Sequence, residues 1–274
     1  MRVPDWVIYV VALAAVLYGL YSNGPSGANA PPPVPEEIAG AGALLSPPSA
    51  FDERILIQTT APQDGVGTAF AVTEDGDWLT ARHVVEGCSE VGLIVGRGAY
   101  VPVRDIRFDE RSDLALLSTG RAPAPAPMDL QGELRVGDEG YHVGFPQGRP
   151  GEATARLLAR SRLVTRGARR GDEPVLAWSE VGRTRGIDGS LGGLSGGPVF
   201  DASGRVRGVV VAESPRRGRI YTAAPASVAA FLERNDVEPE TDGARLFNVS
   251  NYGAEADRAR RNLQVVKVAC QVTE

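Results

Sequence analysis

The segment GGLSGGPVF (residues 192–200) flanks a single serine, Ser195, with two pairs of glycines. A nucleophilic serine needs a tight turn that exposes its hydroxyl, and nearby backbone N–H groups that can bind a developing oxyanion. Glycine permits both because it adopts positive φ readily and carries no side chain. A glycine-rich turn between two strands would have the same composition. Ser195 is therefore a candidate nucleophile only if the chain also supplies a base and an orienting acid.

The chain contains two histidines, and each is a candidate for the base. His83 follows the short predicted strand DWLT (77–80), so we expect it at a strand end, where side chains project into clefts. His142 lies inside an alternating predicted strand, where we expect it to face solvent or a neighbouring side chain. This difference favours His83 as the base.

Asp113 directly precedes the apolar strand LALL and is our candidate for the acid. Asp109 and Asp138 are alternatives only because they are also aspartates. The order histidine, aspartate, serine is that of the catalytic triad on β-barrels. In that chemistry Asp113 accepts a hydrogen bond from one ring nitrogen of His83 and fixes its tautomer. The other ring nitrogen takes the proton of Ser195 as the serine oxygen attacks a carbonyl carbon.

The backbone N–H groups of Gly193 and Ser195 are our candidates for the oxyanion hole of this chemistry. The same residues also fit GxSxG, the nucleophile motif of α/β-hydrolase esterases. In that fold a histidine follows the serine along the chain, whereas no histidine follows Ser195 in this sequence. The residue order therefore excludes an esterase of that kind.

Three segments in this order resemble the catalytic motifs of chymotrypsin/trypsin-like serine proteases, namely TARHVV (80–85), SDLALL (112–117) and GLSGGPVF (193–200). GYHVGFPQG (140–148) and SGGPVFDASGRVRGVVVAES (195–214) resemble a strand with its turn and a hairpin of the bacterial HtrA/Deg-type branch. The resemblance covers about residues 51–234.

The resemblance implies an all-β fold of two six-stranded antiparallel β-barrels, with the triad in the cleft between them. It implies a protease domain over residues 51–236, an inter-barrel linker over 121–133 and a closing helix over 225–235. The expected enzyme is a serine endopeptidase that acts on protein or peptide substrates and uses neither a metal nor an organic cofactor.

The resemblance also assigns substrate-binding positions. Val211, Ala212 and Glu213 match the strand that pairs with the substrate backbone by β-addition. Gly189 stands where the family often carries its specificity determinant. Because no acidic residue occupies that position, we expect a small or apolar side chain before the scissile bond.

Two residues depart from the family pattern. Leu194 stands where trypsin has an aspartate, and leucine cannot form the ion pair with a new N-terminus that accompanies zymogen activation. Glu213 stands where many relatives carry a small residue, and it would narrow the cleft. Both departures favour a second hypothesis, a binding or scaffold protein that keeps the protease fold without useful turnover. The 40 residues after 234 are too few for the PDZ module of typical HtrA proteases, so we expect no such domain.

An uncharged apolar run, WVIYVVALAAVLYGLY (6–21), follows Arg2 near the N-terminus. As a helix it would span roughly 24 Å, somewhat less than a hydrocarbon core of about 30 Å. The positive-inside rule places Arg2 in the cytoplasm and the rest of the chain outside. We therefore expect a transmembrane signal-anchor over residues 1–22, a Pro/Gly/Ala-rich linker over 23–50 and a catalytic domain on the periplasmic side of a bacterial inner membrane. A signal peptide cleaved after ANA (28–30) is the alternative.

The two cysteines, Cys88 and Cys270, match no metal site. In an oxidising compartment they would form one disulfide, and two buried thiols are the alternative. We expect residues 237–274 to form a C-terminal extension with a short helix and a strand. The net charge of −5 is mild, and no aromatic residues interleave with the arginine runs, so nucleic acid is not an expected partner.

Overall fold

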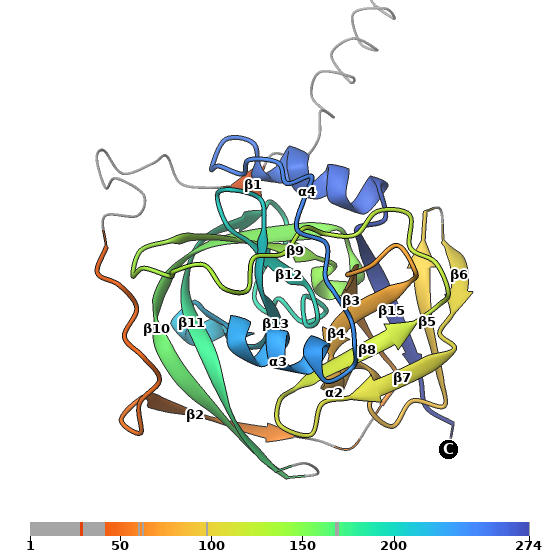
Figure 1. The fold of residues 1–274 in the computed structure, drawn as a ribbon, viewed down its shortest axis with the longest axis horizontal. Helices are drawn as coiled ribbons and strands as arrows, with labels where there is room; N and C mark the ends of the chain where they lie inside the picture. The colour runs from red at the N-terminus through yellow and green to blue at the C-terminus, as the bar shows by residue number, and fades with distance from the viewer. Residues whose placement is uncertain are drawn as a thin grey trace, which may run out of the picture.

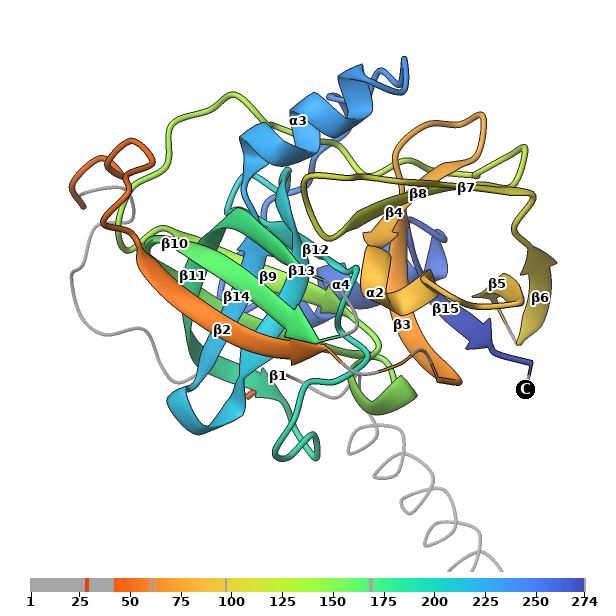
Figure 2. The ribbon, with the colours of Figure 1, turned by 90° about the horizontal axis from the view of Figure 1, so that it is seen from below.

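The computed structural model describes residues 28–29 and 42–273, apart from residues 60, 62, 97 and 168–169. All of the described strands belong to two sheets that lie side by side (Figures 1 and 2). Short strands that are separated by glycine and proline turns are typical of such an all-β fold.

The first sheet contains seven strands in the order β6-β5-β15-β3-β4-β8-β7, and all of its pairings are antiparallel. These strands are β3 (Gly65–Ala71), β4 (Asp77–Ala81), β5 (Glu90–Val95), β6 (Ala99–Pro102), β7 (Asp105–Phe108), β8 (Leu114–Ser118) and β15 (Val265–Gln271). In the bend between β6 and β7, the Val103 N–H donates to Val91 O of β5 and the Arg104 N–H donates to Ser118 O of β8. The bend therefore connects the two ends of the sheet.

The second sheet contains eight strands in the order β1-β11-β14-β13-β12-β9-β10-β2. These strands are β1 (Ala28–Asn29), β2 (Glu53–Thr59), β9 (Glu139–Gly144), β10 (Gly151–Gly167), β11 (Gly171–Thr184), β12 (Pro198–Phe200), β13 (Val206–Ser214) and β14 (Arg219–Ala223). An additional pairing between β10 and β11 closes β9 to β14 into a ring. The strand β2 runs parallel to β10 at the edge of the sheet.

The strand counts differ from the predicted six per barrel, although the two-barrel all-β fold is confirmed. The ring from β9 to β14 matches the expected barrel, and the sheet gains β1 and β2 because residues before the first barrel pair with β11 and β10. The first sheet has seven strands because the bend at residues 103–104 separates β6 from β7 and because the C-terminal residues supply β15.

Besides the C-terminal helix, the described residues contain the short helical segments α2 (Arg82–Val85), α3 (Pro225–Glu233), and the 3₁₀ turns η1 (Pro146–Gly148) and η2 (Pro215–Arg217). The largest apolar cluster spans both sheets. It contains Phe70 and Leu79 of the first sheet and Tyr141 and Phe200 of the second, which are all buried. Because burying such side chains is strongly favourable, this cluster fixes the two sheets relative to one another.

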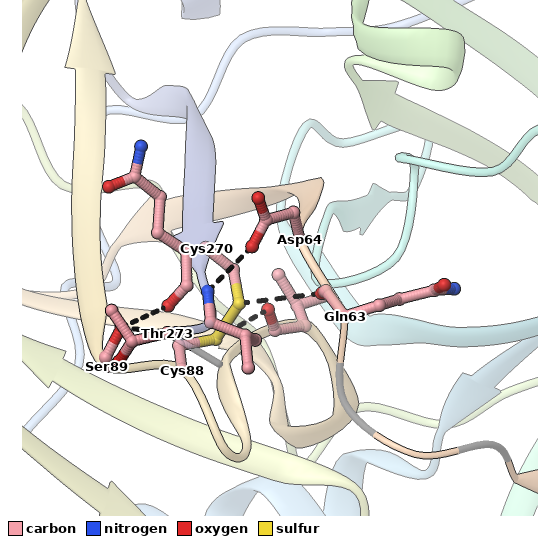
Figure 3. Close-up of a disulfide and its surroundings, with 9 residues drawn as sticks. Gln63, Asp64, Cys88, Ser89, Cys270 and Thr273 are labelled. Carbon is pink, nitrogen blue, oxygen red and sulfur yellow. Dashed lines mark hydrogen bonds between the residues drawn. A yellow bond between two sulfur atoms is a disulfide. The ribbon is translucent and has the colours of Figure 1, made fainter.

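The C-terminal residues contact both sheets. The helix α4 (Tyr252–Arg261) buries Tyr252 in the shared cluster, and Arg260 donates to the Glu152 carboxylate at 2.7 Å. β15 lies between β3 and β5, and a disulfide joins its Cys270 to Cys88, with the two Cα atoms 5.5 Å apart (Figure 3). Residues 237–274, which we expected to form an extension, thus supply a strand of the first sheet and a helix against the second.

The apolar run at residues 6–21 lies outside the described residues, and so does most of the predicted linker. Within the part of the chain that the structure describes, no helix is long and apolar enough to cross a membrane. The described end of the linker lies against the second barrel, where the Leu45 N–H donates to Leu134 O at 2.8 Å.

Candidate active site

His83 and Asp113 meet because their strands are antiparallel neighbours. In the β4–β8 pair, Ala81 lies opposite Leu114, so the end of β4 and the start of β8 share one edge of the sheet. His83 follows in α2, and Asp113 directly precedes β8. The His83 N–H donates to Asp113 Oδ1 at 3.0 Å, and the ring Nδ1 lies 2.5 Å from Oδ2.

The histidine and the aspartate differ in exposure. The Asp113 side chain is 7% exposed and that of His83 is 42% exposed. The Asp113 backbone N–H donates to the carboxylate of Glu173. Glu173 is itself buried and lies near the start of β11 in the second barrel. Because a carboxylate at Nδ1 favours a proton on that nitrogen, Nε2 is left as the acceptor.

The rival residues lie in environments that do not bring them to Ser195's candidate partners. His142 is fully buried, neither ring nitrogen has a hydrogen-bond partner among the described residues, and its ring centroid lies 5.5 Å from that of Trp178 in an edge-on contact. Burial lowers the pKa of His142 to about 3, so the ring is neutral near pH 7. Asp109 accepts from Ser112 and Arg234, and Asp138 accepts from the Arg135 N–H in a turn.

The loop around Ser195 is bonded to both sheets, including the one that leads to the histidine. The Thr68 N–H of β3 donates to Ser195 O at 2.9 Å, and the Gly196 N–H donates to Val210 O at 2.7 Å. Gly196 has φ 84°, and a Cβ at this position would lie 2.1 Å from Thr68 O and 2.8 Å from Ala81 N. Only glycine fits so close to the backbone that leads into α2, so Ser195 lies next to the segment that carries His83.

Two backbone N–H groups of this loop are available as donors. Gly192 O accepts from the Gln147 N–H at 2.5 Å, and Leu194 O accepts from the Gly197 N–H at 2.9 Å. In a trans peptide the N–H points opposite to the carbonyl, so the N–H groups of Gly193 and Ser195 face away from these two partners. Neither N–H donates to any acceptor among the described residues.

The comparisons with known proteins agree with this geometry. A family model described as a trypsin-like peptidase domain matches residues 67–209, which is more than half of the chain. The chain belongs to the trypsin-like peptidase family.

Two similar proteins from bacteria are serine proteases by their names. The chain is 35% identical over 169 residues to a probable periplasmic serine endoprotease, DegP-like, of Rhizobium meliloti, and the match covers 60% of this chain and 31% of that protein. It is 27% identical over 201 residues to the putative serine protease HhoA of Synechocystis, covering 72% of this chain and 50% of that protein. The chain thus spans about a third to a half of the length of these relatives.

Solved structures share the fold at lower identity. The active form of the Rv3671c protease from M. tuberculosis has a TM-score of 0.52 at 18% identity, covering 75% of this chain and 100% of that one. The HtrA-type protease AlgW with a decapeptide has a TM-score of 0.51 at 19% identity, covering 64% of this chain and 53% of that one.

Leu194 has an apolar environment in this peptidase domain. It is 1% exposed and belongs to the core cluster of the second barrel, with Leu191, Val210 and Ile220. An aspartate at this position would need a buried cationic partner, whereas leucine anchors the loop by burying apolar surface. The departure at Leu194 therefore replaces an ionic anchor with an apolar one.

A small cavity lies beside Ser195 in the peptidase domain. Its volume is about 20 Å³, close to that of one water molecule. Its lining is Leu191, Gly192, Leu194, Ser195, Val210, Ala212, Glu213 and Ile220.

The predicted substrate-binding residues divide into those that line this cavity and those that do not. Ala212 and Glu213 line it, but Gly189 is not among the lining residues, and its carbonyl accepts from Arg183 at 2.8 Å. The Glu213 carboxylate accepts from the Leu191 N–H at 2.8 Å and from the Ser190 hydroxyl. Glu213 therefore holds the loop before Ser195 as well as closing one wall of the cavity. Val211 is buried.

The second half of β13 has one free edge. β12 pairs with β13 only as far as Val209, whereas β14 continues along the other edge to Ser214. The edge of residues 211–214 on the β12 side therefore has no strand partner among the described residues, which is where β-addition would place a peptide.

The sequence analysis does not predict several residues of the candidate site. Thr68 is a fully buried polar residue in an otherwise apolar strand, and its hydroxyl donates to Gly193 O at 2.7 Å and accepts from the Phe145 N–H at 3.0 Å. A threonine that interrupts a buried run was the available signal. Glu173 gave no signal, because its contact with Asp113 joins residues from two barrels. Among the described residues, no group of three or more His, Cys, Asp or Glu side chains is arranged to hold a metal ion.

Proposed function

We propose that this chain is a serine endopeptidase with His83, Asp113 and Ser195 as its catalytic triad. The observation that carries the proposal is the His83–Asp113 pair, with Nδ1 2.5 Å from Oδ2, beside a serine loop with two unused backbone N–H groups. Family membership supports the same chemistry.

In the first step, Ser195 Oγ attacks the carbonyl carbon of the scissile bond and its proton passes to Nε2 of His83. The negative charge that forms on the carbonyl oxygen is bound by the N–H groups of Gly193 and Ser195. Asp113 stabilises the imidazolium through its contact with Nδ1. When the tetrahedral intermediate collapses, the C–N bond breaks and His83 gives its proton to the leaving amine.

In the second step, water hydrolyses the acyl-enzyme ester. His83 takes a proton from the water as its oxygen attacks the ester carbonyl, and the same two N–H groups bind the second oxyanion. His83 then returns the proton to Ser195 Oγ as the ester bond breaks. The cycle uses only groups of the chain and water.

The substrate is a protein or peptide that adds as a strand to β13 at Val211, Ala212 and Glu213. The cavity of about 20 Å³ beside Ser195 accepts only a small side chain before the scissile bond. Cleavage of a peptide library tests this specificity, with the expected product ends at alanine, glycine or serine. Strong cleavage after arginine, lysine or phenylalanine would contradict it.

The compartment that we propose is extracytoplasmic. The curated relatives named above include a probable periplasmic endoprotease, and a disulfide such as Cys88–Cys270 persists in oxidising compartments. An N-terminal anchor over residues 1–22 would hold the domain on the periplasmic side of the inner membrane. Fractionation of cells that express the full chain, with protease protection of the domain, tests both parts.

A binding or scaffold role is the second candidate. The observation that favours it is the cavity beside Ser195, which Glu213 helps to close. In a Ser195→Ala background, a scaffold retains its biological activity, whereas a protease loses it. Turnover of any peptide by the wild type, absent in Ser195→Ala, would remove this candidate.

A further inference from the structure

The oxyanion hole that we propose depends on the orientation of one peptide unit, between Gly192 and Gly193. If this unit rotated by half a turn, the Gly192 carbonyl would occupy the place of the Gly193 N–H and would repel an oxyanion. Glycines on both sides of the unit resist such a rotation only weakly, because glycine populates many backbone conformations. A contact outside the loop is needed to hold it.

The contact comes from the η1 turn. The Gln147 N–H donates to Gly192 O at 2.5 Å, which turns the Gly193 N–H to the opposite side. Gly193 also packs tightly on this turn, because a Cβ at Gly193 would lie 2.5 Å from Phe145 O and 3.3 Å from Gln147 N. The orientation of the 192–193 peptide therefore follows the conformation of η1.

Gln147 adopts an unfavourable backbone conformation in this turn. Its φ is 53° and its ψ is 28°, in the left-handed region that non-glycine residues rarely occupy. Such a conformation persists where surrounding contacts enforce it, and it is concentrated at functional sites.

The side chain of Gln147 supplies the enforcing contacts. Its Nε2 donates to Asp188 O at 2.7 Å and to Ser190 O at 2.9 Å, and its Oε1 accepts from Arg149 at 3.2 Å. The side chain thus binds the segment that leads directly into Gly192, while the backbone N–H binds Gly192 itself. Gln147 is exposed, so these contacts serve no apolar core.

We infer that Gln147 is a positioning residue of the oxyanion hole: its side-chain amide holds η1 in the conformation in which the Gln147 N–H fixes the Gly192 carbonyl. This inference rests on the proposed function for its effect on catalysis. Its structural part, the orientation of the 192–193 peptide, does not depend on turnover.

The test compares Gln147→Ala, Gln147→Gly and Gln147→Glu with the wild type, and uses Gln131→Ala, at an exposed glutamine of the inter-barrel linker, as the matched control. Alanine lacks the side-chain amide and disfavours positive φ as glutamine does, so kcat should fall about 10- to 100-fold while KM stays within twofold. Glycine also lacks the side-chain amide but adopts positive φ freely, so kcat should fall less in Gln147→Gly than in Gln147→Ala. Glutamate cannot donate to the two carbonyls and should resemble alanine.

A peptide aldehyde forms an oxyanion with Ser195, so its affinity for each Gln147 variant should fall by the same factor as kcat. Substrate binding in the ground state should not change. The Ser195→Ala variant and the Ser195→Ala/Gln147→Ala double variant should therefore bind substrate equally. A purely structural role would instead lower the melting temperature of the variants. Under the inference, the melting temperature of each variant should stay within about 2 °C of the wild type, because Gln147 is an exposed residue. Equal kcat values for Gln147→Ala and wild type, or a change in KM alone, would overturn the inference.

Crystal structures of the wild type and of Gln147→Ala give a readout that needs no activity. We expect Gly192 O to face Gln147 N in the wild type and to lose this single orientation in the variant. An unchanged carbonyl in the variant would refute the inference about Gln147. An inactive wild type with the expected carbonyl change in the variant would refute the proposed function alone.

Discussion

Replacement of Thr68 by valine tests how the two barrels hold the serine loop. The Thr68 hydroxyl donates to Gly193 O and accepts from the Phe145 N–H, and the residue is fully buried. Valine has nearly the same shape and strand preference, so the substitution removes the two hydrogen bonds with little change in packing. Neither backbone group has another partner among the described residues.

The expected cost follows from the two groups left without partners. Each buried polar group that loses its hydrogen bond costs about 1–3 kcal/mol, and both groups here are only partly buried, so we expect a total of about 3 kcal/mol. At about 2–4 °C per kcal/mol for a domain of this size, the melting temperature should fall by roughly 6–12 °C. The measurement is thermal unfolding by circular dichroism or calorimetry.

Thr68→Ser is the matched control. Serine keeps the hydroxyl and loses one methyl group, which costs about 1 kcal/mol. Thr68→Val should therefore be the less stable of the two variants and should also have the lower kcat, because Gly193 loses a tether. A Thr68→Val protein that is as stable as Thr68→Ser would refute the reasoning that these hydrogen bonds hold the loop.

Three further predictions follow from other contacts. Asp113→Asn should lower kcat by about 1000- to 10,000-fold without unfolding the domain, because asparagine does not hold His83 in the required tautomer; a loss below tenfold in steady-state kinetics would argue against the role. His142 has a folded pKa of about 3, below its ordinary value near 6.5, so the unfolded state binds the proton first and stability falls as pH drops below 6.5, by about 2 kcal/mol at pH 5. Denaturant unfolding should show this slope in the wild type and its loss in His142→Leu. Replacement of Cys88 and Cys270 by serine should reduce the free energy of unfolding by about 2–5 kcal/mol, since the disulfide closes a loop of 182 residues; equal denaturation midpoints for the two proteins would contradict this.

The sequence predicted the residues that carry chemistry better than the elements that hold them. His83, Asp113 and Ser195 stand in short motifs whose residue types and order have a chemical reason, and the structure places the first two in contact. The two-barrel fold followed from the same motifs and is confirmed. What the motifs could not predict is the pairing of distant segments, since local propensity does not specify strand partners.

β15 illustrates this limit. Its alternation predicts a strand, but nothing in residues 265–271 indicates that it lies between β3 and β5 rather than outside the domain. Gly189 illustrates a different limit, that of assigning a substrate-binding role from a position in the sequence. Its role in substrate binding is implied by the family resemblance, whereas in the structure its carbonyl accepts from Arg183 and Glu213, not Gly189, lines the cavity.

Labelling with a fluorophosphonate tests the central claim most directly, because this reagent reacts only with a serine that a base has activated. The full chain and its Ser195→Ala and His83→Ala variants would be treated at pH 7.5, after circular dichroism has shown that all three are folded, and the modified peptide would be identified by mass spectrometry. The account predicts a single adduct on Ser195 in the wild type and none in either variant. A folded wild-type protein that remains unlabelled, or that carries the label on another residue, would contradict it.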